Sequence, residues 1–197
     1  NDLAIKSINE FYGKGDEAAV QFLYPVILTC KGLFIEPKGN LEEKLIMHLK
    51  AEEIFKKVFD IENTINLNLT HTFYNLAYVY SKLTAKNIRT DMALAEDYSK
   101  KALYYSEIAE KKLKEFYTEN YVKLSSYLYT FCELYMEINQ QEKSLEKLLE
   151  LRNCLKTIPD NNENRYKLDN IEKKFNIARC DFGIYKLYKQ DNSFKES

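Results

Sequence analysis

Apolar side chains recur every three or four residues along most of the chain, which is the spacing of one face of an α-helix. Clear runs of this kind begin at Leu69, Ala95, Tyr121, Leu145 and Leu168. The last run predicts a C-terminal helix over residues 165–189. We expect its apolar stripe to consist of Leu168, Ile171, Phe175, Ala178, Phe182 and Tyr185.

Polar segments rich in Gly, Asn or Pro separate these runs. We expect breaks at residues 12–16, 36–40, 61–66, 83–91, 138–141 and 158–164. Residues 83–91, LTAKNIRTD, are expected to form a longer joint, with Thr90 or Asp91 as the N-cap of the next helix. The breaks leave about eight helices, mostly antiparallel neighbours, and therefore an all-α fold.

The composition supports helices with short connections, because the 197 residues include only 5 Gly and 3 Pro. The 29 basic and 30 acidic residues are interspersed and leave a net charge of −1. No block of like charge therefore predicts a nucleic-acid partner or a membrane surface. No apolar run has the length of a bilayer span, so we expect no membrane insertion. Since the chain begins at Asn1 rather than Met, we expect a piece of a longer protein.

Catalytic and metal-binding patterns do not stand out. His48 and His71 have no catalytic partner that the sequence identifies, and GKG at residues 13–15 lacks the spacing of a P-loop. We therefore expect no enzyme, no cofactor and no metal site. No two cysteines form a CxxC pair, and we expect buried free thiols in a reducing, cytoplasmic compartment. The cysteines are Cys30, Cys132, Cys154 and Cys180.

Small residues at a regular separation indicate an internal repeat. The tetratricopeptide repeat (TPR) is a helix pair with small residues at its eighth and twenty-seventh positions, where the two helices approach closely. The pairs that fit this spacing are Gly32 with Ala51, Cys132 with Leu151 and, with six residues inserted, Ala77 with Ala102. The pattern predicts one domain over residues 1–197, a right-handed superhelix with units at about 17–60, 68–116 and 118–157 and a final helix at about 165–189.

The repeat register predicts two stripes on the helix that contains NLTHTFYNLAYVYSKL, residues 68–83. One stripe is expected to pack inside the stack and consists of Phe73, Leu76, Ala77 and Tyr80. The other is expected to line a concave groove and consists of His71, Tyr74, Tyr78 and Ser81. The equivalent groove residues are Ser126, Tyr129, Glu133 and Met136 in the next unit, and Val26, Thr29, Leu33 and Glu36 in the preceding unit. Tyr and His suit protein recognition, since each has an apolar body and a polar tip. The alternative is that the second stripe only packs on another helix.

Three stretches stand out in their order along the chain: GLFIEPKGNLEEKLIMHLKAEEIF (32–55), THTFYNLAYVYSKL (70–83) and NIARCDFGIYKLY (176–188). In these segments and their order, the chain resembles the N-terminal, repeat-bearing half of the kinesin-binding protein family. The resemblance implies an all-helical cytosolic protein, associated with the cytoskeleton, that clamps the motor domain of certain kinesins. The bound motor would then be kept from its microtubule by steric occlusion. Two other functions fit the repeats: a general TPR scaffold, such as a kinesin-light-chain-like cargo adaptor, and the sensor domain of a bacterial peptide-responsive regulator.

Overall fold

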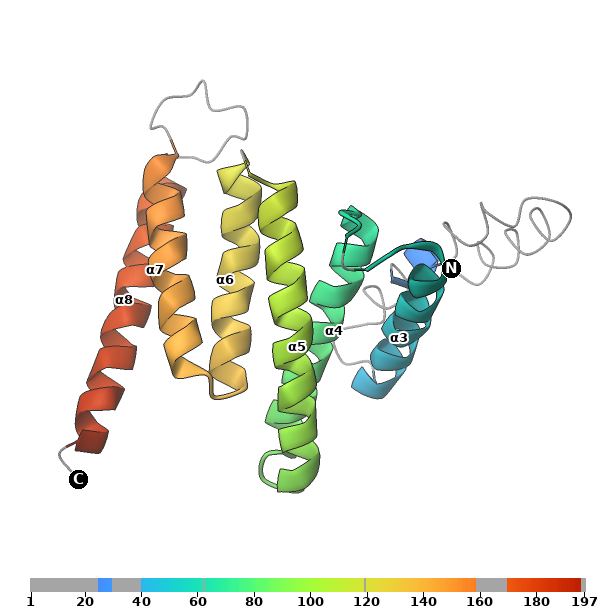
Figure 1. Cartoon of the computed structure of the whole chain (residues 1–197). Coiled ribbons are helices and arrows are strands. Elements are labelled where there is room, and N and C mark those ends of the chain that lie inside the picture. Colours follow the sequence, from blue (N-terminus) through green and yellow to red (C-terminus); the bar gives the residue numbers. More distant parts are fainter. Residues whose placement is uncertain (1–24, 30–39, 62, 119, 159–169, 196–197) are drawn as a thin grey trace, which may run out of the picture. The chain divides into compact units, whose positions relative to one another are not determined.

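The computed structural model describes residues 25–29, 40–61, 63–118, 120–158 and 170–195, and within them it contains helices and no strand (Figure 1). The all-α class expected from the sequence is thus confirmed for this part of the chain. A short helical stretch covers residues 25–29. The longer helices are α3 (Leu41–Val58), α4 (Leu67–Asn87), α5 (Met92–Phe116), α6 (Tyr121–Glu137), α7 (Gln141–Thr157) and α8 (Asn170–Lys195).

The chain forms two compact units, Asn1–Lys112 and Leu113–Ser197. The boundary between them falls within α5. The single domain expected over residues 1–197 stays a prediction. The break expected at residues 12–16, and most of those at 36–40 and 158–164, lie outside the described residues.

Four helices begin at an Asn or Asp whose side chain accepts a hydrogen bond from a backbone N–H of the first turn. The capping residues are Asn40, Asn66, Asp91 and Asn120. Such a side chain satisfies an amide that has no partner within the helix, which stabilises the helix start. Asp91, whose Oδ1 accepts from the N–H of Leu94 at 3.0 Å, is confirmed as an N-cap.

Helix α4 is longer than expected, and the joint predicted at residues 83–91 is wrong in its first half. The helix continues to Asn87, so only residues 88–91 connect it to α5. Leu83 is fully buried, and Lys86 forms an ion pair at 2.8 Å with Glu42 of α3. Because these side chains make contacts when the backbone is helical, the inserted residues lengthen the helix instead of forming a loop.

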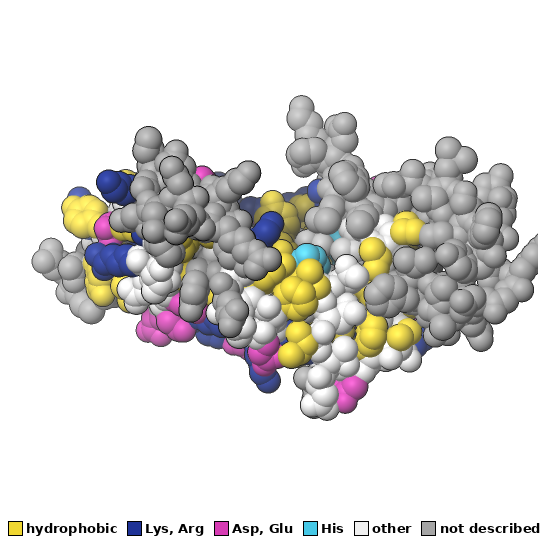
Figure 2. All heavy atoms as spheres, turned by 90° about the horizontal axis from the view of Figure 1, so that it is seen from above, with side chains coloured by type: hydrophobic (Ala, Val, Ile, Leu, Met, Phe, Trp, Pro, Cys, Tyr) yellow, Lys and Arg dark blue, Asp and Glu magenta, His cyan; other side chains and the backbone are white. Residues whose placement is uncertain are grey.

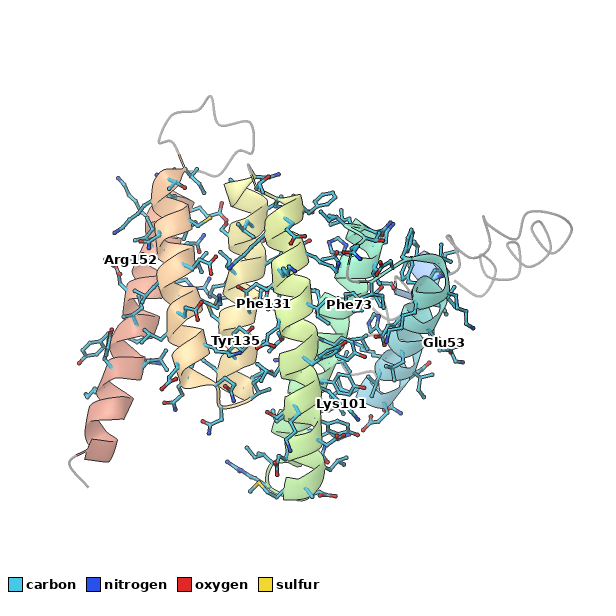
Figure 3. The ribbon with its side chains drawn as sticks, viewed as in Figure 1. Glu53, Phe73, Lys101, Phe131, Tyr135 and Arg152 are labelled. Atoms are coloured by element: carbon cyan, nitrogen blue, oxygen red, sulfur yellow. The ribbon has the colours of Figure 1, made fainter. Side chains whose placement is uncertain are left out.

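The core of the first unit is centred on α4. All four residues expected to pack inside, Phe73, Leu76, Ala77 and Tyr80, are buried, as the sequence predicted. The ring of Tyr105 on α5 stacks on both Phe73 and Tyr80, at centroid distances of 6.0 and 5.8 Å. Figure 3 labels Phe73 on α4. Rings in offset contact of this kind add to the stability that burial alone provides.

In the second unit, α6 and α7 run antiparallel and are joined by a tight turn (Figure 1). Asn139 adopts a left-handed conformation with φ of 58°. The N–H of Gln140 donates to the carbonyl of Tyr135 at 2.8 Å, and the N–H of Asn139 donates to that of Met136 at 3.1 Å. These two bonds form a Schellman motif, which ends the helix by pairing its last carbonyls. The break expected at residues 138–141 is therefore confirmed.

Helix α8 packs with the face opposite to the one expected. Its buried residues, Cys180 and Leu187, join apolar clusters with α6 and α7, and Ile177 and Ile184 pack against the same clusters. The described part of the predicted stripe faces solvent instead: Phe175, Phe182 and Tyr185 are each about 60% exposed, and Ala178 is exposed. Leu168 and the side chain of Ile171 lie outside the described part of the chain. A Cβ on Gly183 would lie 3.1 Å from Cδ1 of Leu148, so the small residue lets α8 approach α7 closely on the side that is buried.

Candidate functional site

Hydrophobic side chains reach the surface in several places on the face that Figure 2 presents, among basic and acidic ones that are not separated by sign. On α4, the side chains that reach solvent form a line along one face of the helix. His71 and Tyr74 are partly buried, Tyr78 is 41% exposed, and Lys82 continues the line one turn later. Their spacing of three and four residues is that of neighbours on a helix surface. The first three match the expected groove stripe, and their role in binding stays a prediction.

Ser81 does not belong to this line, so its prediction as a groove residue is wrong. The side chain is fully buried, and its hydroxyl donates to the carbonyl of Tyr78 at 2.9 Å. A helix turns by about 100° per residue. Ser81 is therefore only about 20° around the helix from Tyr74, and it is buried because neighbouring segments pack over this part of α4. Lys82 is only partly buried, with Nζ 5.0 Å from the centroid of the Tyr78 ring.

The chemistry of the α4 line is aromatic with one cationic end. Burial lowers the pKa of His71 below its ordinary value, so the imidazole is uncharged at neutral pH. Lys82 lies over the ring of Tyr78 as a cation–π pair. Tyr78 is 41% exposed, so this contact leaves much of the residue open to solvent. The line thus offers apolar contact area together with polar tips.

On α6, the expected groove residues also lie on the outer side. Ser126, Glu133 and Met136 are exposed, the last of them by 49%, and Tyr129 is partly buried. Arg179 of α8 donates a hydrogen bond to the phenol oxygen of Tyr129, and its guanidinium carbon lies 4.3 Å from the ring centroid. Burial, and then hydrogen bonding to Glu133, raise the pKa of Tyr129. The arginine therefore fixes this tyrosine between α6 and α8.

None of the expected groove residues of the preceding unit is seen to be exposed in the part of the chain that the structure describes. Val26 is partly buried, and Leu33 and Glu36 lie outside the described residues. Thr29 is buried, and its hydroxyl is 2.9 Å from that of Thr72 on α4. The prediction that Thr29 faces a groove is therefore wrong, because its side chain packs against α4.

Two residues of these surfaces, Lys82 and Arg179, were not among the site residues predicted from the sequence. Lys82 could have been found, because it lies four residues after Tyr78 on the same helix face. Arg179 could not, because it is 50 residues from Tyr129 and only the packing of α8 brings them together.

The cysteines that the structure describes behave as expected. Cys132, Cys154 and Cys180 are free and buried. Burial raises the pKa of all three thiols, to about 11 for Cys154 and Cys180. Each thiol is therefore protonated at neutral pH and a poor nucleophile. Cys30 lies outside the described residues.

A cleft of about 520 Å³ opens beside the turn between α6 and α7. Its lining is Asn139, Gln140, Gln141, Glu142, Leu145, Leu187 and Tyr188. Glu142 is the one charged side chain among these residues. Within the described ranges, no three His, Cys, Asp or Glu side chains gather closely enough to hold a metal ion.

None of the described helices is both long enough and apolar enough to cross a bilayer. Comparison with known proteins found no matching family model, no matching curated protein and no matching solved structure.

Proposed function

We propose that this chain is a protein-binding module of the tetratricopeptide type, and that it binds a kinesin motor domain, the partner implied by the sequence resemblance, along the solvent-facing line of α4. The observation that carries the proposal is the position of Tyr78. Tyr78 is 41% exposed on a helix that is otherwise mostly buried, and Nζ of Lys82 lies 5.0 Å from the centroid of its ring.

The repeat architecture is supported by burial at the positions where the repeat needs close approach. Ala77 and Ala102 are fully buried. Cys132 and Leu151 are both 3% exposed. These are the paired small positions of the second and third predicted units, and a TPR stack requires them at helix crossings.

Tyrosines suit the proposed binding because they bring a large contact area with few rotatable bonds. Tyr78 and Tyr74 are four residues apart and share one helix face. In the proposed mechanism the rings contact a helix of the motor that otherwise meets tubulin. Binding then blocks microtubule attachment by occupying the same surface, and no bond is made or broken.

The test is the affinity of the chain for purified kinesin motor domains, measured by calorimetry for the parent protein, Tyr78→Ala and Tyr74→Ala. Loss of an anchoring ring costs about 2 kcal/mol, or roughly a thirtyfold rise in Kd. Tyr104→Ala is the matched control, because Tyr104 is 54% exposed on α5 and outside the α4 line. Its Kd should equal that of the parent.

The outcomes separate the candidate functions. Motor binding that weakens with Tyr78→Ala but not with Tyr104→Ala supports the proposal. Equal binding by all variants overturns the assignment to α4. If no motor domain binds, but another protein binds to the parent and not to Tyr78→Ala, the chain is a general scaffold and the kinesin assignment fails.

A further inference from the structure

The outer face of α8 carries an apolar seam. Phe175, Phe182 and Tyr185 are 61%, 59% and 60% exposed, and the exposed Ala178 lies between them. The steps of three, four and three residues place these side chains in one line. The residues that α8 buries, with Cys180 and Leu187 at their centre, lie on the opposite face.

The rim of this seam is basic. The exposed cations are Lys174, Arg179, Lys186 and Lys189. The guanidinium carbon of Arg179 lies 5.8 Å from the ring centroid of Phe175, and Nζ of Lys186 lies 4.7 Å from that of Phe182. Of the nearby carboxylates, Glu172 is at the start of the helix, and Asp181 forms an ion pair at 2.7 Å with Arg152 of α7. Glu133 of α6 is hydrogen-bonded to Tyr129, the residue to which Arg179 donates. Figure 3 labels Arg152 on α7.

We propose that the outer face of α8 docks an amphipathic α-helix of a partner protein, with an apolar seam flanked by acidic residues. This surface lies in the second unit and goes beyond the function proposed for α4. The line of side chains at steps of three and four matches the seam along which two helices pack. The basic rim then selects an acidic partner by charge complementarity.

The rim also argues against two other occupants of such a face. A second copy of the chain, placed face to face, would bring Lys186 and Lys189 close to the cations on the rim of the other copy. Nucleic acid would bring phosphates to the rim but would leave the apolar line of Phe175, Ala178 and Phe182 without a matching surface. An anionic lipid surface satisfies both the rings and the cations, so it is included as an arm of the test.

The probes are two synthetic helical peptides with leucines at the a and d positions of each heptad. One carries glutamates at the flanking e and g positions, and the other carries lysines there. Binding to the 197-residue chain is followed by fluorescence anisotropy. The glutamate peptide should bind about tenfold more tightly than the lysine peptide, and the difference should shrink as salt is added.

Variants locate the binding. Phe182→Ala should weaken binding of the glutamate peptide by about tenfold or more, without lowering Tm, since the ring is exposed. The double variant Lys186→Glu, Lys189→Glu should reverse the preference between the two peptides. Tyr78→Ala is the matched control with an exposed ring on another surface, and it should leave peptide binding unchanged.

Several results would overturn the inference. They are equal binding of the two peptides, equal binding by Phe182→Ala and the parent, and binding to phosphatidylcholine–phosphatidylserine vesicles that is tighter than peptide binding and is lost in Phe182→Ala. Concentration-dependent dimerisation that Phe182→Ala abolishes would assign the face to a second copy. None of these results bears on motor binding through Tyr78, so the two proposals fail independently.

Discussion

The phenol of Tyr105 on α5 donates a hydrogen bond to Oε2 of Glu52 on α3 at 2.9 Å, and both residues are buried. Burial, followed by the charge of Glu52, raises the pKa of Tyr105, so the phenol keeps its proton and acts as the donor. The bond joins α3 to α5 through two residues that are 53 positions apart in the sequence.

Tyr105→Phe should therefore destabilise the protein although it keeps the ring stacked on Phe73 and Tyr80. Removing a hydrogen bond to a buried charged group costs about 1.5–3 kcal/mol in the free energy of unfolding, which urea denaturation measures. Tyr104→Phe is the control, since Tyr104 is exposed. Equal stability of the two variants would mean that the Tyr105–Glu52 bond contributes nothing.

Stability should fall in mild acid because of His48. The side chain is 1% exposed, and burial, helped by the charge of Lys44, lowers its pKa from 6.5 to about 4. Unfolding lets the imidazole take up a proton that the folded state resists. The contribution of the uncharged His48 to the free energy of unfolding is complete above pH 6.5 and is lost as pH falls towards 4. The loss amounts to about 3 kcal/mol at most.

The check is the free energy of unfolding of the parent and of His48→Gln between pH 7 and pH 4.5. Carboxylates titrate in both proteins, so the difference between their slopes isolates His48. The parent should lose more stability over this range. Parallel curves would show that His48 is protonated as easily in the folded protein as in the unfolded chain.

Larger side chains at the tight helix crossings should destabilise the fold. Ala77 and Ala102 are fully buried, so Ala77→Leu and Ala102→Leu should each cost about 1–3 kcal/mol through overpacking. Ala178→Leu is the matched control, because Ala178 is exposed. If the variants at all three positions have the same Tm, the tight crossings at Ala77 and Ala102 are refuted.

The turn between α6 and α7 should depend on the residue at its left-handed position. Asn139 has φ of 58°, which Gly and Asn adopt more readily than other residues. Asn139→Ala should cost about 1 kcal/mol in unfolding free energy, whereas Asn139→Gly should cost a few tenths at most. Thermal unfolding distinguishes them, and an alanine variant as stable as the glycine variant would contradict the strain argument.

Spacing alone was enough to predict the packed side of α4 but not that of α8. On α4, the large apolar residues Phe73 and Leu76 fall on one face, and that face is buried. On α8, two apolar lines run along opposite faces with the same steps of three and four. The buried face includes Gly183, whose lack of a side chain allows close contact with Leu148 of α7. Periodicity contains no information about that neighbour.

In the candidate site, too, helical spacing predicts some positions and not others. The outward positions of Tyr74 and Tyr78 follow from helical spacing, and so does Lys82 once the helix is placed. The burial of Ser81 and the contact of Arg179 with Tyr129 follow from packing between helices. The first could not be predicted before the packing around α4 was known, and the second could not be predicted before the arrangement of α6 and α8 was known.

The buried hydroxyls of α4 mostly bond to the helix that carries them. Those of Thr70, Ser81 and Thr84 donate to carbonyls three or four residues earlier. Thr72 does the same and also meets Thr29. When a hydroxyl that donates to a carbonyl of its own helix is replaced, no group on another helix loses its hydrogen-bond partner. Replacing Thr70 or Thr84 by Val is therefore expected to change the free energy of unfolding very little. The hydroxyls at these two positions are therefore dispensable for the packing around α4, unlike that of Thr72, which contacts Thr29.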